Sequence, residues 1–398
     1  MSRGAKIADW VTSSPIIDGV LFGSSDGEVE GPPVCAVAVA RGFRGFGKGV
    51  TQSDALGSAV GEALEQYAAS QVRPEHLLRA PLRELEGRAF DPRWLCLYSE
   101  EQYSRLGFPY RRFNPDRPLH WVRGRWLDTG EPVYLPAFAV WLASNFEEET
   151  LCQVTSNGLA AGSSVEDAAN RAALELYERD AFLSSWIALK PKDRVSLNSL
   201  APAIVEIVEH LRSRGAYLEV YLLESGTPAF VAVCVGLGDG HGWPAVTLGL
   251  GAGQDRDQAV RKAILEHGQT GPLLARIWRN RELPTPRSAE DIRTLRDHAL
   301  YYCDPCHAGE FKRWRDAANI AAAQDRRAER RMASPRPRLA IADLTPPDLE
   351  YSPFRVVRAL ACGLQPIWCG HGFERSFTTR LHDSLNGRDP NLAPLPVC

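Results

Sequence analysis

Features that would assign this chain to several common classes are missing from its sequence. The 46 basic and 49 acidic residues leave a formal net charge of −3, which gives no case for binding nucleic acid or a membrane surface. No apolar run reaches the ~18 residues that a membrane-spanning helix requires. The N-terminal stretch MSRGAKIADWVTSSP also lacks the apolar core of a signal peptide. We therefore expect a cytoplasmic protein that binds neither nucleic acid nor membranes.

Two common ligand signatures are absent or weak. The stretch GKG around Lys48 does not have the G-x-x-x-x-G-K-[ST] spacing of a Walker A loop, although Lys48 remains a candidate phosphate ligand. The nine cysteines should be mostly free thiols in a reducing compartment. A four-thiolate zinc site from Cys303, Cys306, Cys362 and Cys369 is an alternative, but the unequal spacing of the two pairs favours structural thiols.

The sequence does contain a loose alternation of strand and helix patterns. Hydrophobic residues make up 44% of the chain, enough for a sizeable core. Apolar, β-branched runs predict strands at 34–40, 218–223, 229–238, 245–251, 338–344 and 354–361. Helical periodicity predicts helices near 53–70, 164–188, 202–214, 256–279 and 308–333. This alternation indicates an α/β fold. Because no clean linker interrupts it, we expect one continuous domain over residues 1–398.

One motif occurs three times. Each copy has a glycine, an alanine six residues later, a second alanine after four more, and then two acidic or amide residues at successive steps of three. The copies are Gly49/Ala55/Ala59/Glu62/Glu65, Gly162/Ala168/Ala172/Glu175/Glu178 and Gly253/Ala259/Ala263/Glu266/Gln269. On a helix, steps of four, three and three stay on one face. The repeat therefore predicts three helices that each carry a small, then acidic, stripe.

Such a stripe suggests a nucleotide site. The free N–H groups and dipole at a helix start attract anions, and the alanines are expected to leave room for a nucleotide. Several carboxylates brought together repel one another unless cations join them. Hard oxygen ligands beside phosphate point to Mg²⁺, and Arg179 and Lys262 can supply positive charge to phosphate oxygens. Solvated glutamate pairs or duplicated core helices explain a single copy, but three matched copies favour a Mg-nucleotide site.

The three segments resemble the YcaO family of ATP-dependent enzymes that modify the peptide backbone. The resemblance rests on GKGVTQSDALGSAVGEALEQYAA, SNGLAAGSSVEDAANRAALELYERDA and AVRKAILEHGQ, together with ADLTPPD and FRVVRALACGLQPIW nearer the C-terminus, and it covers the chain from about Ile16 onward. It implies a YcaO-like fold of mixed sheets packed with helices. The three related glycine-helix units would surround the nucleotide site.

The resemblance also implies a set of ligands. ATP and Mg²⁺ would lie among the helices, with Glu62, Glu65, Asp167, Glu178 and Glu266 as metal ligands. The cofactor-binding residues would be Lys48, Ser163, Glu175, Arg179, Lys262 and Gln269. Three positions depart from the usual family pattern: Asp167 stands for Glu, Ser163 for Asn, and Lys262 for Arg. Lysine keeps the charge of arginine but loses its two-pronged donor geometry.

Family members activate a peptide-bond oxygen by phosphorylation, so the resemblance implies an ATP-dependent cyclodehydratase that makes azolines from Cys, Ser or Thr residues of a ribosomal precursor peptide. Alternatives are thioamide formation with a sulfur-delivering partner and a non-catalytic ATP-binding scaffold subunit. The whole chain is used by the family-like region, which implies a separate partner that captures the precursor leader. A flavin dehydrogenase acting later and a homodimeric assembly complete the expected partners.

The tail PNLAPLPVC favours the azoline product, since azoline-forming members have a Pro-rich C-terminus near the active site. Pro394, Pro396 and Cys398 are therefore candidate catalytic-site residues, although Val397 and Cys398 extend beyond the last proline. A disordered tail is the alternative. His267 follows Glu266 and could act as a base, but a helix-surface histidine is the favoured interpretation.

Overall fold

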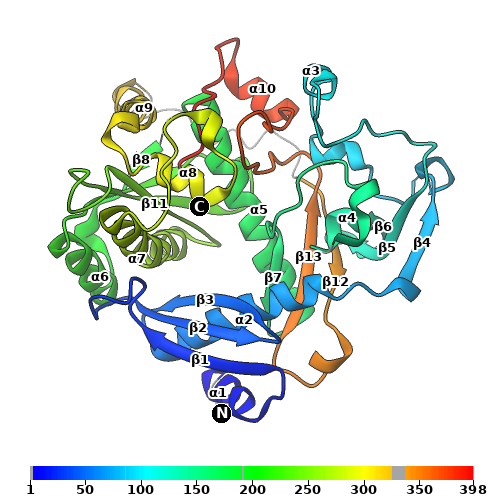
Figure 1. Cartoon of the computed structure of the whole chain (residues 1–398), viewed down its shortest axis with the longest axis horizontal. Coiled ribbons are helices and arrows are strands. Elements are labelled where there is room, and N and C mark those ends of the chain that lie inside the picture. Colours follow the sequence, from blue (N-terminus) through cyan, green and yellow to red (C-terminus); the bar gives the residue numbers. More distant parts are fainter. Residues whose placement is uncertain (1–2, 86, 143, 191, 325–336, 398) are drawn as a thin grey trace.

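The computed structural model describes residues 3–85, 87–142, 144–190, 192–324 and 337–397 (Figure 1). All six predicted strands are present, as β2 (Val34–Ala40), β9 (Tyr217–Leu223), β10 (Phe230–Leu237), β11 (Val246–Gly253), β12 (Leu339–Asp343) and β13 (Arg355–Ala361). The predicted helices correspond to α2 (Gln52–Ser70), α5 (Val165–Ala188), α6 (Pro202–Ser213), α7 (Arg256–Asn280) and α9 (Ala308–Gln324). The part of the last predicted helix beyond residue 324 lies outside the described residues.

Other elements of the fold carry no strong sequence pattern. They are α1 (Arg3–Ser13), β1 (Ile17–Gly23), β3 (Phe43–Gly49), β4 (Leu77–Ala80), α3 (Glu100–Ser104), β5 (Leu119–Trp126), β6 (Pro132–Pro136), α4 (Ala137–Val140), β7 (Leu159–Gly162), β8 (Lys192–Arg194), α8 (Leu295–Tyr301) and α10 (Thr379–Leu385). Among them, β3 (FRGFGKG) has three glycines in seven residues, and β7 (LAAG) is mostly alanine and glycine, residues that β-propensity disfavours.

The strands form three sheets with helices between them (Figure 1). One sheet has the order β1-β2-β3, a second β11-β10-β9-β8, and a third β4-β5-β12-β13-β7 with β6 paired to β5. Every pairing between these named strands is antiparallel. The fold is therefore a mixed α/β architecture built from several separate sheets.

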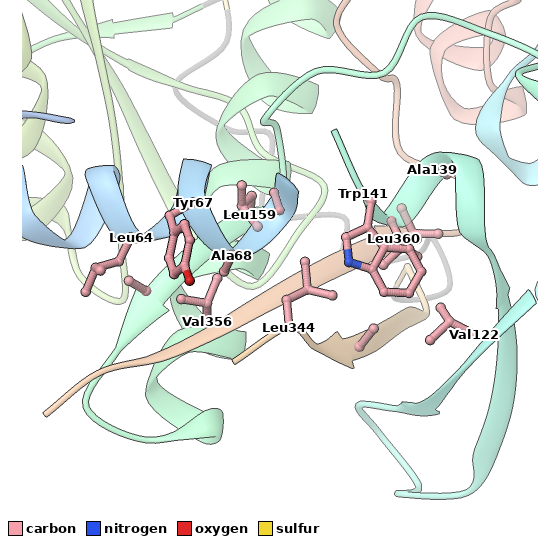
Figure 2. Close-up of a cluster of buried hydrophobic side chains, with 14 of the residues drawn as sticks. Leu64, Tyr67, Ala68, Val122, Ala139, Trp141, Leu159, Leu344, Val356 and Leu360 are labelled. Carbon is pink, nitrogen blue, oxygen red and sulfur yellow. The ribbon is translucent and has the colours of Figure 1, made fainter. Parts of the chain in front are cut away.

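Both faces of the six-stranded sheet are covered by helices. On one face, Val356 and Leu360 of β13 belong to the same core cluster as Leu64 and Tyr67 of α2 (Figure 2). On the other face, Val357 and Ala359 pack with Ala168, Ala169 and Ala172 of α5. The alternation of side chains along β13 thus assigns α2 and α5 to opposite sides of one strand.

The four-stranded sheet is covered in the same way. On one face, Val220 and Cys234 share a cluster with α6 and α7. On the other, Val233 and Leu248 share a cluster with Phe182 and Trp186, which belong to the C-terminal half of α5. Helix α5 therefore packs on the six-stranded sheet with its first half and on the four-stranded sheet with its second half.

Each of the three repeated segments forms a strand followed directly by a helix: β3 with α2, β7 with α5, and β11 with α7. The helices start at side-chain caps, in which Thr51, Ser164 and Asp255 accept a hydrogen bond from the backbone N–H three residues later. The three motif copies are thus equivalent in local structure as well as in sequence.

The role expected for the motif alanines was wrong. Ala55, Ala59, Ala168, Ala172, Ala259 and Ala263 are fully buried. A Cβ added at Gly47 would lie 2.3 Å from the backbone nitrogen of Ala59, and one added at Gly251 would lie 2.3 Å from that of Ala263. The small residues therefore let a helix backbone approach a strand backbone closely, and they do not leave room for a nucleotide.

Candidate nucleotide and metal site

The acidic residues of the motif lie where the three sheets meet. Glu175, Glu178 and Arg179 occupy the middle of α5, between the half that covers one sheet and the half that covers another. Helix α2 covers the three-stranded sheet and also contacts β7, while α7 covers β11 and also contacts β3. These contacts bring glutamates from all three helices into one neighbourhood.

An ion pair joins two of the three units. Lys48 on β3 pairs with Glu266 on α7, and both side chains are partly buried. Burial opposes the charge on each group, yet the partner dominates: the pKa of Lys48 is raised by Glu266, Glu62 and Glu178, and the pKa of Glu266 is lowered by Lys48 and Arg179. Both groups are therefore charged at neutral pH.

Gln269, one turn after Glu266, makes a second link between the same units. Its Nε2 donates to the backbone oxygen of Gly47 at 3.3 Å, so α7 is held to β3 at two levels.

Glu62 and Glu178 face this ion pair from α2 and α5. Burial is the main cause that raises the pKa of each carboxyl, and the charge of Glu266 raises both further. Lys48 acts in the opposite direction on both, and Arg179, with its Nε 3.8 Å from Glu178 Oε1, lowers the pKa of Glu178. The neighbouring cations therefore only partly offset the effect of burial on the pKa of these two carboxyls.

Glu65 and Glu175 form a second pair beside the first. The backbone N–H of Ala161 donates to Glu65 at 2.6 Å, and that of Gly158 donates to Glu175 at 3.3 Å. Burial raises the pKa of Glu65 well above its ordinary range and that of Glu175 to about 7, while the backbone donors act in the opposite direction. Each carboxylate thus ties its helix to a turn or strand around β7.

Lys262 contributes another cation from α7. Its Nζ donates to the backbone oxygen of Ala252 at 2.8 Å. Burial lowers the pKa of Lys262, and the nearby charges of Arg171 and Arg261 add to that effect, whereas Glu178 opposes it.

Ser163 and Asp167 lie at the start of α5 and bond to each other. The backbone N–H and the hydroxyl of Ser163 donate to Asp167 at 2.8 and 2.9 Å, and Arg171 Nε donates to Asp167 at 3.1 Å. These donors lower the pKa of Asp167 in spite of its partial burial. Asp167 lies in the first turn of α5, about 16 Å along the helix axis from Glu178, and Ser163 precedes the helix.

The oxygen ligands of the central cluster fit a divalent cation. Glu62, Glu65, Glu175, Glu178 and Glu266 lie among the cations Lys48, Arg179 and Lys262, and Arg171 and Arg358 also act on Glu65 and Glu175. In the part of the chain that the structure describes, no three His, Cys, Asp or Glu side chains are already arranged to hold a metal ion. Mg²⁺ commonly takes only one or two protein carboxylates and completes its shell with phosphates and water. The donor set therefore fits Mg²⁺ together with a phosphate ligand.

The C-terminal tail is packed onto the second half of α5. The carbonyl of Pro394 accepts a hydrogen bond from the Tyr302 hydroxyl at 2.7 Å, and that of Ala393 accepts one from Trp186 Nε1 at 3.1 Å. Leu395 and Val397 are buried in the same cluster as Trp186, and Pro396 is buried as well. The alternative of a disordered tail is thus wrong up to residue 397, whereas Cys398 lies outside the described residues.

The histidine beside the cluster is not on the helix surface, so that interpretation was wrong. His267 is fully buried, and its Nε2 lies 2.8 Å from Thr247 Oγ1. Gly236 and Gly249 supply the space, since a Cβ at either would collide with the residue. Burial lowers the pKa of His267 to about 3.

The cysteine interpretation agrees with the structure. The eight cysteines that the structure describes are free thiols, as predicted. Cys303 is buried and Cys306 is exposed, and neither belongs to a metal-ligating group in the described residues.

Sequence reasoning missed two polar residues next to the glutamates. Arg358 lies in the apolar strand β13 with 4% of its surface exposed, and Asn157 precedes the glycine that donates to Glu175. Both line a cavity bounded by β13, residues 152–157 and the loop after β13. The available signal was an arginine inside the otherwise apolar run VVRALA. A buried charge is costly unless it is paired or hydrogen-bonded, so an arginine in such a strand indicates a polar partner nearby.

Comparison with known proteins identifies the family. A family model described as YcaO cyclodehydratase, ATP- and Mg²⁺-binding, matches residues 46–365 of the 398. The chain belongs to the YcaO family, and ATP and Mg²⁺ are its cofactors. No helix in the described ranges combines the length and apolarity needed to cross a bilayer.

Solved structures share the fold at low sequence identity. A heterocyclase in complex with substrate and cofactor matches with a TM-score of 0.71 at 21% identity, over 96% of this chain and 54% of the other. YcaO from Methanopyrus kandleri, bound with AMPPCP and Mg²⁺, gives 0.61 at 22% identity over 91% of both chains. The E. coli microcin synthetase McbBCD complex with pro-MccB17 bound gives 0.61 at 14% identity, over 87% of this chain and 88% of that chain.

Curated relatives match over a shorter range. An uncharacterised protein of Methanothermobacter thermautotrophicus is 28% identical over 230 residues, which cover 56% of each chain. A protein encoded in the tfuA 3′ region of Rhizobium leguminosarum bv. trifolii is 28% identical over 240 residues, covering 56% of this chain and 54% of its own. The chain thus spans about half the length of the curated relatives that it matches.

Proposed function

We propose that the protein is an ATP-dependent cyclodehydratase subunit that converts Cys, Ser or Thr residues of a ribosomal precursor peptide to azolines. The observation that carries this proposal is the cluster of five glutamates and three cations, contributed by three equivalent strand-helix units. Membership of the YcaO family supports the reaction class. In that reaction a side-chain nucleophile adds to the amide carbon, the amide oxygen takes a phosphoryl group, and phosphate leaves.

When bound, ATP supplies the γ-phosphoryl group, and the chain's own residues supply positioning and charge. Lys48, Arg179 and Lys262 would hold the phosphates, while Glu62, Glu178 and Glu266 would hold Mg²⁺. Because little covalent chemistry falls to the protein in phosphoryl transfer, such positioning accounts for most of the catalysis. Glu65 and Glu175 would fix the two ends of β7 around the site, since both bond to its backbone or to the adjoining turn.

Glu175 also offers a proton-transfer group. Its pKa of about 7 lets the carboxyl take or release a proton near neutral pH, as general acid-base catalysis requires. We assign Ser163 and Asp167 to the outer end of the nucleotide site, because they lie at the start of α5 with Arg171. The docked tail, with Pro394 and Pro396, would order the peptide rather than the nucleotide.

The proposal includes partners. A separate protein would capture the leader of the precursor peptide, and a flavin dehydrogenase would act on the azoline products. We further propose that the protein works as a homodimer in the cytoplasm. If a leader-binding partner is required, the isolated protein should modify peptide slowly and accelerate when the partner is added.

The test is a reconstituted reaction of this protein, its partner and a precursor peptide with Mg-ATP, followed by mass spectrometry. Azoline formation requires ATP turnover and the loss of one water per modified residue. Exchange of oxygen for sulfur, with a sulfur donor present, would replace the azoline assignment by thioamidation. ATP binding without any peptide-dependent turnover would leave a scaffold subunit and reject the enzymatic proposal.

A further inference from the structure

An open groove with a volume of about 500 Å³ lies beside the glutamate cluster. Its walls come from the second half of α2, the end of α4, the short helix η4 (Ser144–Glu149) and residues 154–156. In Figure 2, its floor residue Trp141 lies above β13 on the same side as Tyr67 and Ala68 of α2. The volume falls within the roughly 300–1,000 Å³ that is usual for ligand pockets.

Helix α2 connects this groove to the nucleotide site. Gln66 lines the groove, and it directly follows Glu65 in the sequence. It also lies one turn after Glu62, so the three side chains share one side of the helix. The stripe that carries the acidic residues of the first motif copy therefore continues into the wall of the groove.

The turn before β7 forms a second connection. Ser156 lines the groove, and its backbone oxygen accepts a hydrogen bond from the N–H of Leu159 at 2.8 Å. Within the turn that this bond closes, the N–H of Gly158 donates to Glu175 at 3.3 Å. The groove thus shares one wall with a segment that bonds to the glutamate cluster, and a ligand bound there would lie next to the nucleotide site.

Contacts behind the opposite wall hold the groove in shape. The carboxylate of Glu149 accepts a hydrogen bond from the backbone N–H of His120 at 2.7 Å and lies 2.8 Å from the Nδ1 of the same residue. The ring of Phe146 stacks on that of Trp141, with the centroids 6.2 Å apart, and its backbone oxygen accepts a hydrogen bond from Thr150 Oγ1. Because η4 is fixed by these contacts, a ligand would bind without having to order this wall.

The groove offers polar groups that the protein itself does not use. The carboxamide of Gln66, the carboxylate of Glu147 and the hydroxyl of Ser156 have no hydrogen-bond or ion-pair partner among the described residues. Gln66 is half-buried, whereas Glu147 and Ser156 are exposed, so all three groups are open to a ligand. A carboxamide both donates and accepts hydrogen bonds, as does a peptide unit, so Gln66 matches a peptide backbone.

The remaining lining decides the chemistry of the ligand. Leu142 and Val154 are partly exposed above the buried floor, which offers contacts to an apolar side chain. Glu147 is the one charged side chain among the described residues that line the groove, and Glu148 next to it is also exposed. This negative rim, with no cation in the described lining, disfavours a phosphate group and favours a basic side chain.

We infer that this groove binds a short segment of the precursor peptide in which an apolar residue is flanked by basic ones. The apolar side chain contacts Leu142 and Val154, a basic side chain lies beside Glu147, and the peptide backbone bonds to Gln66. The inference rests on the proposed function and adds to it a preference for the residues beside the one that is modified.

The test is the binding of three blocked tripeptides to the full chain, measured by saturation-transfer NMR. The probes are acetyl-Lys-Leu-Lys-amide, acetyl-Glu-Leu-Glu-amide, which reverses the charges, and acetyl-Lys-Ala-Lys-amide, which removes the large apolar side chain. We expect the first peptide to bind at least fivefold more tightly than either of the others. Equal or tighter binding of the acidic peptide, or of the alanine peptide, would overturn the inference.

Variants show whether binding occurs in this groove. Glu147→Lys should reverse the preference, so that acetyl-Glu-Leu-Glu-amide binds more tightly than acetyl-Lys-Leu-Lys-amide. Glu148→Lys makes the same charge change at the neighbouring exposed residue, which is not part of the lining, and should alter the preference less than twofold. Gln66→Ala should weaken both peptides at least threefold. Equal effects of the two lysine variants, or unchanged binding in Gln66→Ala, would overturn the inference.

Two further results separate this inference from the proposed function. The tripeptide should bind equally well with saturating Mg-ATP present, and its displacement by Mg-ATP would assign the groove to the nucleotide instead. Parent protein that binds Mg-ATP by calorimetry but none of the peptides would reject the groove and keep the nucleotide site. Peptide binding that depends on Glu147, without loss of water in the reconstituted reaction, would keep the groove and reject azoline formation.

Discussion

The two halves of α5 are packed by opposite means. In the first half, Ala168, Ala169 and Ala172 bring the helix backbone close to β13 of the six-stranded sheet. In the second half, Phe182 and Trp186 fill the space above the four-stranded sheet with large rings, whose centroids are 6.4 Å apart. Between the halves, Glu175 bonds to the turn before β7, and Glu178 lies near Lys48, Lys262 and Glu266. The comparison shows that the small residues of the first half set the distance between α5 and its sheet, whereas the large residues of the second half fill a wider space. The polar segment with Glu175 and Glu178 lies at the change from one kind of packing to the other.

The largest effect should follow from emptying the aromatic half. Trp186→Ala removes a fully buried indole and the hydrogen bond to Ala393, so we expect a loss of about 3–5 kcal/mol in the free energy of unfolding. Trp186→Phe, which keeps a ring, should lose much less. Denaturant unfolding curves measure this difference. The comparison is valid when the m-value, the dependence of the free energy of unfolding on denaturant concentration, is the same in the variants and the parent protein. Equal stability of the Ala and Phe variants would show that packing in this half is not what holds α5.

The polar segment between the halves should control nucleotide binding without controlling stability. Glu178→Lys reverses a charge beside Glu266 and Lys48, and we expect Mg-ATP affinity to fall at least 100-fold, about 2.7 kcal/mol. Calorimetry measures the affinity, and thermal unfolding checks that the fold is intact. Undiminished ATP affinity would remove Glu178 from the nucleotide site.

Overfilling the small half should be costly but less so. Ala172→Leu adds three carbons against β13 and should cost about 1–3 kcal/mol in stability, because a tightly packed site must shift to admit them. Asn170→Leu, at an exposed position of the same helix, is the matched control and should change stability by less than about 0.5 kcal/mol. If both variants were equally stable, the close contact between the two backbones would not be limiting.

The tail that docks on the aromatic half should matter for peptide processing only. The double change Pro394→Ala and Pro396→Ala loosens the tail while keeping its buried Leu395 and Val397. We expect peptide dehydration to slow about tenfold, about 1.4 kcal/mol in the barrier, with ATP affinity unchanged. Pro390→Ala is the control. A parallel loss of ATP affinity would place the tail at the nucleotide site instead.

The last prediction concerns the pH dependence of stability in the polar segment. Burial raises the pKa of Glu175 from about 4.5 to about 7, so between these values the folded protein holds a proton that the unfolded chain releases. Stability contributed by this group is therefore present below pH 4.5 and is lost as pH rises towards 7, by up to about 1.4 kcal/mol per unit. Glu175→Gln should remove this part of the slope in unfolding curves from pH 5 to 7. An identical slope in the variant would mean that Glu175 is ionised throughout.

The sequence predicted the helices of the repeated units because their pattern is local. A glycine followed by alanines and acidic or amide residues on one face indicates a helix and its start without reference to the rest of the chain, and a helix was found at each of the five predicted positions. Strands β3 and β7 were missed because their glycines and alanines serve packing against a helix, which propensity does not record. The wrong role for the motif alanines has the same cause, because propensity does not show that a small residue is needed for packing between a helix and a strand.

Contacts between distant segments were beyond sequence reasoning. Nothing local places His267 under the glycines of β10 and β11, or Arg358 beside Asn157. The tail was expected near the active site, but its docking on Trp186 and Tyr302 depends on the aromatic cluster that three separate helices build.

The strand order of the six-stranded sheet has a consequence for biosynthesis. The four-stranded sheet is complete in sequence once Gly253 has been made, whereas the sheet β4-β5-β12-β13-β7 lacks its two central strands until Ala361. At ordinary translation rates those strands follow roughly a hundred residues later, on the order of 5–20 s. During that interval β5 and β7 have open edges, and the first half of α5 has no β13 to cover. We therefore expect a ribosome-bound chain in which the aromatic half of α5 already has the four-stranded sheet to cover, while its alanine half lacks β13.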